Sequence, residues 1–293
     1  MTASTIPDSP FPIPGSPGPI AFIGGGNMAR SLIGGLIARG TAARSIHVAE
    51  PGEPSREALA ADFGVNVFAD NAEAVRTAQV WVLAVKPQVL RQVCEALAPI
   101  ASAQRPLVVS IAAGITSGQI ARWLGANETP DAALAIVRCM PNTPAMLGAG
   151  VTGLFATAQV DAQGRAQAEA LLSSAGATVW IDDEAKMDAV TAVSGSGPAY
   201  VFLLAEAMEA AAKAEGLPDA AARTLVLQTL LGAARMLTES NEAPAELRRR
   251  VTSPGGTTQA AVETFEAGGL RELVAKAIGN ATERGRQLSA AND

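Results

Sequence analysis

Between Pro19 and about residue 180, short apolar runs rich in β-branched residues alternate with stretches whose apolar residues recur at helical spacing. The apolar runs predict strands at residues 19–23, 45–50, 65–68, 80–85, 106–113, 134–141, 151–156 and 177–181. The stretches between them predict helices at residues 27–40, 54–64, 71–78, 88–100, 116–125 and 165–176. Strands separated by helices of this length favour right-handed crossover connections and a doubly wound, parallel α/β sheet.

After residue 185 the strand pattern stops, and the segments at residues 198–218, 220–240, 244–251, 257–269 and 270–288 all read as helices. The first of them is apolar nearly all round from Tyr200 onward, so it is expected to be buried on every side. Roughly 110 residues of helix are too few to cover this apolar helix on all sides within one chain. We therefore expect residues 184–293 to form an all-α domain that dimerises. A Rossmann-type dinucleotide-binding domain is predicted at 18–183.

The chain has 293 residues, a formal net charge of −6 and 48% hydrophobic residues. The negative charge argues against a nucleic-acid partner or an anionic membrane surface. No apolar stretch approaches the roughly 20 residues that a membrane-spanning helix needs. Residues 1–17 are crowded with Pro and Ser and lack the charged start and apolar core of a signal peptide. We therefore predict a disordered tail on a cytoplasmic protein.

Cysteine and histidine are scarce in this chain. Cys94 and Cys139 are the two cysteines, and their wide separation suits a reducing cytoplasm and excludes a cysteine-based metal cluster. His47 is the sole histidine and stands inside a strand pattern, so we expect it to be structural. With one histidine, every His-dependent triad and most metal sites are excluded, and we expect chemistry without a bound metal.

The first predicted strand runs into a glycine-rich turn that opens the first predicted helix. The turn reads Gly24-x-Gly26-x-x-Ala29, the G-x-G-x-x-G/A pattern of dinucleotide-binding proteins. Gly24 permits the tight turn, Gly26 lets a pyrophosphate approach the backbone, and Ala29 allows close packing of helix on strand. The first N–H groups of the helix would face the phosphates. The same turn is lined by Ile23, Gly25, Asn27 and Met28.

Two further strand ends carry candidate cofactor contacts. Glu50 ends the second predicted strand, near where an acidic residue binds the ribose hydroxyls of NAD. A carboxylate there repels the 2′-phosphate of NADPH and so favours NADH; the alternative is a solvated glutamate near Arg44 and Arg56. Lys86 follows the buried strand 80–85, where ligands gather in open sheets. It is a candidate cofactor contact, general acid or strand-end cap, and we favour the contact.

The stretch Ser-Pro-Gly-Gly-Thr-Thr at residues 253–258 stands directly ahead of a predicted helix. Its glycine pair allows backbone conformations closed to other residues, and we expect Thr257 or Thr258 to be the N-cap. Several backbone N–H groups would stay unpaired beyond it, which favours an anion site over an ordinary capped helix start. A second Gly-rich helix start, at residues 194–200, is expected either to wall the same pocket or to serve close helix packing.

Five motifs give the chain a resemblance to the pyrroline-5-carboxylate reductases: AVKP, SIAAG, RCMPNTPA, AVSGSGPAYVF and VTSPGGTTQAAVETFE. The resemblance covers almost everything from Pro19 to the C-terminus. It implies reduction of (S)-1-pyrroline-5-carboxylate to L-proline with NADH or NADPH, the last step of proline biosynthesis. It also implies an N-terminal Rossmann domain and a helical domain that interlocks two subunits in a homodimer, sometimes assembled further into rings of dimers.

The same resemblance implies roles for particular residues. The implied cofactor contacts are the Gly24–Met28 turn, Asn71, Ala84, Val85, Lys86 and Pro87. The implied contacts near the nicotinamide are Ala112, Ala113, Gly114 and Asn142. The implied substrate contacts are Gly256, Thr257 and Thr258, with Glu184 as an addition that no motif anchors.

Two positions depart from the family's pattern. The position of Glu50 is often a small polar residue in relatives that use NADPH, which again favours NADH. Ala243 stands where many relatives have a histidine, so that position supplies no essential acid here.

The implied reaction asks little of the protein. Hydride from the reduced nicotinamide attacks the imine carbon, and the ring nitrogen must be, or become, protonated. Because a cyclic imine can enter as the iminium, positioning supplies much of the rate. Thr258 is the candidate catalytic residue; its hydroxyl either relays a proton to the nitrogen or only orients the substrate.

Two rival functions are weighed against this one. A 3-hydroxyacid dehydrogenase or a related imine reductase needs a catalytic Lys or Asp on the first long helix of its second domain. Residues 199–214 contain Glu206 and Glu209, and their only lysine, Lys213, is close to the far end. A non-catalytic nucleotide sensor would keep the fold but has no need of residues 253–258 beside an intact cofactor turn.

Overall fold

The computed structural model describes residues 18–126 and 133–291, and the predicted tail at residues 1–17 lies outside this range. The described residues form two compact units. The first comprises the residues up to Gly195 together with those from Ala281 onward, and the second is Ser196–Asn280. Residues 184–195 and the end of the chain thus belong to the sheet-containing unit, whereas the prediction placed them in the helical domain.

The first unit is built on an eight-stranded sheet in the order β3-β2-β1-β4-β5-β6-β7-β8. Its strands are β1 (Ile20–Ile23), β2 (Ile46–Ala49), β3 (Asn66–Phe68), β4 (Val80–Leu83), β5 (Leu107–Ser110), β6 (Ile136–Met140), β7 (Gly150–Ala156) and β8 (Gly176–Trp180). From β3 to β6 every neighbouring pair is parallel, which confirms the predicted doubly wound sheet. The strand order reverses between β1 and β4, so these two strands flank the switch point of the sheet.

One connection departs from the parallel pattern. β6 pairs antiparallel with β7, and β7 pairs parallel with β8. Only the short 3₁₀ segment η3 (Thr143–Leu147) lies between β6 and β7. A parallel crossover needs a dozen or more residues, usually a helix, so this short link can only turn the chain back.

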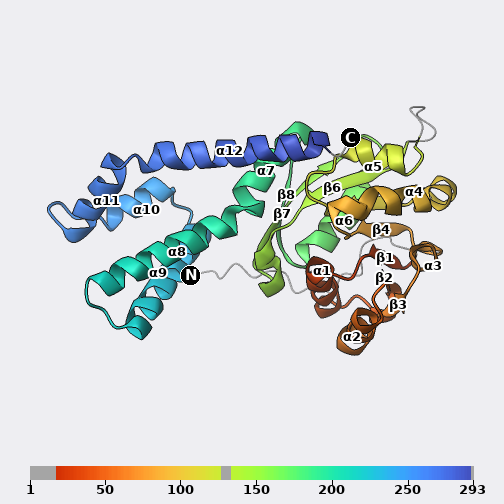
Figure 1. The fold of residues 1–293 in the computed structure, drawn as a ribbon, viewed down its shortest axis with the longest axis horizontal. Coiled ribbons are helices and arrows are strands. Elements are labelled where there is room, and N and C mark those ends of the chain that lie inside the picture. Colours follow the sequence, from red (N-terminus) through yellow and green to blue (C-terminus); the bar gives the residue numbers. More distant parts are fainter. Residues whose placement is uncertain (1–17, 127–132, 292–293) are drawn as a thin grey trace. The chain divides into compact units, whose positions relative to one another are not determined.

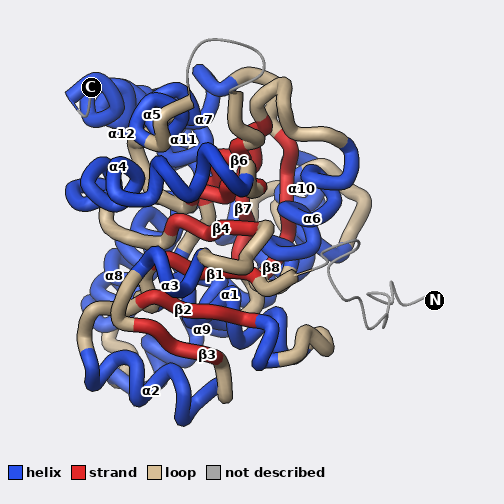
Figure 2. Tube along the Cα trace, turned by 90° about the vertical axis from the view of Figure 1, so that its right-hand side faces the viewer, coloured by secondary structure: helices blue, strands red, loops and turns tan. Residues whose placement is uncertain are grey.

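Helices cover both faces of the sheet (Figures 1 and 2). They are α1 (Asn27–Ala38), α2 (Glu53–Phe63), α3 (Asn71–Val75), α4 (Pro87–Gln104), α5 (Ser117–Trp123), α6 (Ala162–Ser173) and α7 (Met187–Val190), with shorter turns η1 (Ala43–Ser45), η4 (Glu184–Lys186) and η5 (Thr191–Gly195). Buried residues of α1, α2 and α6 pack on one face, and those of α3, α4 and α5 pack on the other. Because both faces are covered, the central strands are apolar without alternation, as the sequence predicted.

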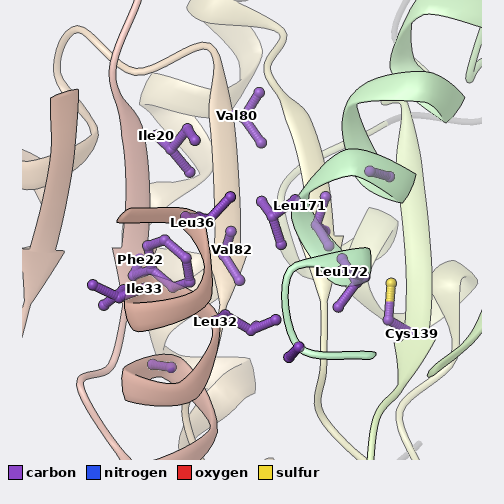
Figure 3. Packing of buried hydrophobic residues seen from close by; sticks show 14 of the residues in the cluster. Ile20, Phe22, Leu32, Ile33, Leu36, Val80, Val82, Cys139, Leu171 and Leu172 are labelled. Atoms are coloured by element: carbon purple, nitrogen blue, oxygen red, sulfur yellow. The ribbon is translucent and has the colours of Figure 1, made fainter. Parts of the chain in front are cut away.

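The core on the α1 side shows how the strands alternate. Ile20 and Phe22 of β1 face Leu32 and Leu36 of α1, and Leu171 of α6 continues the same cluster (Figure 3). The intervening residues of β1 belong to the cluster on the opposite face. Fully burying one such side chain contributes roughly 1.5–3 kcal/mol, so this packing fixes the strand ends that carry the candidate site.

The second unit is all-helical, as predicted. Its helices are α8 (Gly197–Ala214), α9 (Asp219–Glu239), α10 (Pro244–Arg250), α11 (Thr257–Ala267) and the first part of α12 (Leu270–Ala291). Among the described residues of the chain, no helix combines the length and the apolar character that a membrane crossing requires.

The expected burial of the helix around Tyr200 is not met within this chain. Helix α8 has no buried residue, and Phe202 and Leu203 are each 66% exposed. The other helices of this unit do not cover α8 on all sides, and the dimerisation prediction is based on the same shortage of covering helices. An exposed apolar surface of this kind is typical of a protein–protein interface.

Candidate cofactor and substrate sites

The predicted cofactor residues gather at one edge of the sheet. Strands β1 to β6 run parallel, so their carboxyl ends meet at the same edge. Each predicted cofactor segment follows one of these ends: Gly24–Met28 after β1, Glu50 after β2, Asn71 after β3, Ala84–Pro87 after β4, Ala112–Gly114 after β5 and Asn142 after β6. Since β1 and β4 flank the switch point, the geometry is that of a dinucleotide-binding crevice.

The glycine turn has the backbone features that a pyrophosphate site needs. Gly24 has φ +101°, and a Cβ there would lie 2.7 Å from the carbonyl oxygen of Ala84. Gly26 is the N-cap of α1 and has open space where its Cβ would be, while Ala29 is buried against the sheet. A Gly N-cap supplies no side-chain oxygen, so the first N–H groups of α1 remain available to an anion. The turn therefore fits a dinucleotide.

Glu50 lies directly beside this turn. Its carboxylate accepts hydrogen bonds from the backbone N–H of Gly25 and of Gly52, each at 3.1 Å. Arg56 donates to the carbonyl oxygen of Glu50 at 2.8 Å, and Arg44 donates to Asn66. Within the described residues no ion pair joins either arginine to the Glu50 carboxylate. A negative charge thus stands at the end of β2, facing the turn.

The remaining cofactor positions differ in their surroundings. Lys86 is exposed and is the N-cap residue of α4, and Pro87 begins that helix. Ala112 is buried, Ala113 is exposed and Gly114 has φ +71°. Cofactor contacts at these positions stay predictions.

Asn142 has partners within the protein. Its Nδ2 donates to the carbonyl oxygen of Ser194 at 3.2 Å, and its Oδ1 accepts from the N–H of Val151 at 3.0 Å. Asn142 therefore ties the end of β6 to η5 and β7. Gly195, next to Ser194, would place a Cβ 2.5 Å from Cε of Met140, the mobile end of a flexible side chain, so both roles predicted for residues 194–200 stay open.

The threonine-glycine corner at residues 253–258 comprises the last residues of the link from α10 and the first two residues of α11. The prediction that Thr257 or Thr258 is the N-cap is wrong: Gly256 is the N-cap, with φ −84° and ψ 170°, and the helix begins at Thr257. Gly256 lacks a side chain that could accept a hydrogen bond from the first turn. Among the described residues no acceptor is found for the N–H groups of Thr257, Thr258 and Gln259. The true N-cap thus leaves more free donors than a threonine cap would.

Side chains fix the shape of this corner. Gly255 has φ +70°, and its N–H donates to Oε1 of Gln259 at 2.7 Å. Nε2 of Gln259 donates to Glu263 at 2.6 Å, which orients the amide. Arg248 of α10 pairs with Glu266 of α11 at 3.1 Å, joining the two helices that flank the corner.

The ion pairs of α10 and α11 also explain the basic run at residues 248–250. Arg249 pairs with Glu246 and Arg250 with Glu242, so the three arginines are committed within the helical unit. A hydrogen bond from Arg271 lowers the pKa of the Glu266 carboxyl below its usual range. Glu266 is therefore ionised at neutral pH and available to both arginines.

Sequence reasoning missed a buried ionic cluster in the sheet-containing unit. Arg138 of β6 is 4% exposed and lies between the carboxylates of Glu184 and Asp188. The signal was an arginine in the middle of an otherwise apolar strand pattern. Both oxygens of Glu184 are hydrogen-bonded, to the N–H and hydroxyl of Ser117. The substrate contact predicted for Glu184 stays a prediction.

Family models match both parts of the chain. Residues 184–288 match the model described as pyrroline-5-carboxylate reductase dimerisation. Residues 19–114 match the model described as NADP oxidoreductase, coenzyme F420-dependent. The second match covers the strands and turns that carry most of the predicted cofactor residues.

Individual relatives agree along nearly the whole length. The chain is 52% identical over 270 residues to pyrroline-5-carboxylate reductase of Pseudomonas aeruginosa, covering 92% of this chain and 96% of that protein. It is 37% identical over 270 residues to the enzyme of that name from Pisum sativum, covering 92% and 96%.

Solved structures give the same result. A pyrroline-5-carboxylate reductase from Coxiella burnetii superposes with a TM-score of 0.88 at 43% identity, covering 93% of this chain and 98% of that one. The pyrroline carboxylate reductase of Plasmodium falciparum with NADP bound gives a TM-score of 0.79 at 27% identity, covering 94% and 99%. The chain belongs to the pyrroline-5-carboxylate reductase family.

Proposed function

We propose that this protein is an oxidoreductase that reduces (S)-1-pyrroline-5-carboxylate to L-proline with NADH or NADPH, the last step of proline biosynthesis. The observation that carries the proposal is the start of α11, where Gly256 as N-cap leaves the N–H groups of Thr257, Thr258 and Gln259 without an acceptor among the described residues. Helix N-termini bind carboxylates, and the substrate of the 52% identical relative carries one carboxylate. The sheet-containing unit by itself offers a cofactor site at the glycine turn after β1.

The reduced nicotinamide supplies a hydride for the imine carbon. The protein's own contribution is to bind and orient. The amides at the start of α11 hold the carboxylate, and the hydroxyl of Thr258 holds the ring nitrogen and its proton. The N–H groups at the start of α1 and the open space above Gly26 receive the pyrophosphate. Because a cyclic imine can enter already protonated, orientation rather than a strong acid supplies the rate.

We propose that NADH is the preferred cofactor. Support comes from Glu50, whose carboxylate lies against Gly25 of the turn and would face a 2′-phosphate as a like charge. The substitution Glu50→Ser removes that charge and keeps a small hydrogen-bonding side chain. It is expected to raise the kcat/KM ratio of NADPH over NADH by roughly tenfold or more, equal to about 1.4 kcal/mol. An unchanged ratio would remove Glu50 as the determinant.

We further propose a cytoplasmic homodimer formed through the helical unit, with rings of dimers as a higher assembly. Exposed apolar side chains on α8, among them Phe202 and Leu203, support the dimer. Buried, unpaired Cys94 and Cys139 support a reducing compartment. Light scattering of the purified protein distinguishes a monomer, a dimer and a ring by mass.

The activity is tested by mixing protein, pyrroline-5-carboxylate and NADH or NADPH, and following the absorbance of the reduced nicotinamide. Loss of that band, with proline as the product, is the expected result. If neither NADH nor NADPH is oxidised, the proposed reduction is contradicted, and the result would favour a nucleotide-binding protein that does not catalyse this reaction.

A further inference from the structure

The cluster around Arg138 joins four segments that are far apart in the sequence. The guanidinium of β6 lies 3.3 Å from a carboxylate oxygen of Glu184 in η4 and 3.5 Å from one of Asp188 in α7. Glu184 accepts from the N–H and the hydroxyl of Ser117, at 2.7 and 2.6 Å, at the start of α5. Asp188 accepts from the hydroxyl of Ser289, at 3.4 Å, in the last part of α12. All these residues belong to the sheet-containing unit.

A second contact ties α5 to the same part of α12. Nε2 of Gln119 donates to the carbonyl oxygen of Ser289 at 3.0 Å. A Cβ on Gly114 would lie 3.7–3.9 Å from atoms of Leu288 and Ser289, which is ordinary packing distance. The loop Ala112–Gly114, between β5 and α5, is therefore backed by the end of α12 and anchored where α5 begins.

Stability alone does not account for this cluster. The pair of Arg138 with Asp188 is buried, and a buried ion pair loses so much hydration that apolar replacements are often equally stable or more stable. A guanidinium, however, can hold two carboxylates at once in a fixed geometry, which neither an apolar side chain nor an ammonium does equally well. Arg138 is therefore suited to fixing the positions of η4 and α7. Because Glu184 and Asp188 in turn bind Ser117 and Ser289, Arg138 also fixes the positions of these two serines.

We propose that Arg138 is a positioning residue for the cofactor, acting through Glu184 and Asp188 to fix the Ala112–Gly114 loop against the end of α12. The inference rests on the proposed function, because it takes this loop to be the part of the site that contacts the nicotinamide. It assigns Glu184 to this task rather than to the substrate.

The test compares two ligands in the full-length protein by calorimetry. NADH reports the whole cofactor site, whereas ADP-ribose lacks only the nicotinamide ring and reports the contacts of the adenosine, the pyrophosphate and the second ribose. The variants are Arg138→Lys, which keeps the charge but loses the fork, and Glu184→Gln, which keeps the shape but loses the charge. The matched control is Lys186→Gln, which breaks an exposed ion pair with Asp182 two residues from Glu184.

In both cluster variants the Kd of NADH is expected to rise roughly tenfold, the effect of one lost hydrogen-bonding contact, while the Kd of ADP-ribose changes by less than about twofold. Lys186→Gln leaves both constants unchanged. Equal rises for the two ligands, or no rise for NADH, would overturn the proposal. So would a Glu184→Gln variant that raises only the KM of pyrroline-5-carboxylate.

Removing a partner from a buried pair can prevent folding, so thermal melting accompanies each titration. If Arg138→Lys does not fold, Glu184→Gln and Ser289→Ala test the proposal in its place, through the ratio of the Kd of NADH to the Kd of ADP-ribose. Wild-type protein that does not oxidise NADH with pyrroline-5-carboxylate contradicts the proposed function and this inference with it. Active wild-type protein whose variants keep the wild-type ratio contradicts the inference alone.

Discussion

Replacing Thr257 by proline removes one backbone donor from the start of α11 and leaves the helix in place. Thr257 is the first residue of the helix, the position where proline is best tolerated. The preceding residue, Gly256, has ψ 170°, the extended conformation that a residue before proline requires. Within the described part of the chain the N–H of Thr257 has no acceptor, so the fold loses no hydrogen bond.

The magnitude follows from the contact that disappears. A hydrogen bond to a charged group contributes about 1.5–3 kcal/mol, and each 1.4 kcal/mol is a factor of ten. Thr257→Pro is therefore expected to lower kcat/KM for pyrroline-5-carboxylate by roughly 10- to 150-fold. Reduction of 1-pyrroline, which has no carboxylate, is expected to stay the same. The assay for both substrates is steady-state oxidation of NADH.

Thr257→Ala is the matched control, because it removes the same hydroxyl and methyl group but keeps the N–H. It is expected to retain nearly all activity toward both substrates. Equal values of kcat/KM for the proline and alanine variants would refute the claim that the amide binds the carboxylate. If Thr257→Pro lowers kcat/KM for 1-pyrroline as much as for pyrroline-5-carboxylate, the substitution has instead disturbed the backbone of the threonine-glycine corner.

Three further predictions concern other parts of the molecule. Thr258→Ala is expected to lower turnover about tenfold or more, the effect of one lost hydrogen bond, while the Kd of NADH is unchanged; unchanged turnover would exclude Thr258 from the mechanism. Gly26→Ala is expected to weaken NADH binding in calorimetry, because the new methyl group would occupy the open space proposed for the pyrophosphate, and to leave the melting temperature nearly unchanged. Gly24→Ala is expected to lower both the affinity for NADH and the melting temperature, because its Cβ would clash with a carbonyl oxygen. Burial raises the pKa of the Cys94 thiol to about 12, so this thiol is expected to resist alkylation at pH 8 in the native protein, with mass spectrometry as the readout. Rapid alkylation of Cys94 in the native protein would contradict that burial.

The sheet could be predicted because its signals are local. The continuous apolar run around Trp81 and the glycine turn after β1 each identify a buried strand or a strand-to-helix turn without knowledge of distant residues. The antiparallel placement of β7 could have been read from the shortness of the link before it. Strand ends then follow from topology, which is why the predicted cofactor residues share one edge.

The rest depends on contacts between distant residues, which a single sequence does not display. Gly256 rather than a threonine caps α11 because of the backbone path set by Gly255 and Gln259. The partners of Arg138 come from positions 184 and 188, and the contact with Ser289 lies 101 residues beyond Asp188. The exposed apolar face of α8 supports the proposed dimer, which the sequence indicated through the shortage of covering helices and through the family resemblance.

The most direct test of the account is a crystal structure of the protein with L-proline and NAD⁺ bound. In that structure the proline carboxylate is expected to accept hydrogen bonds from the N–H groups of Thr257, Thr258 and Gln259, and the nicotinamide is expected to contact the Ala112–Gly114 loop. Proline held at any other place, or these three amides covered by another part of the protein, would contradict it.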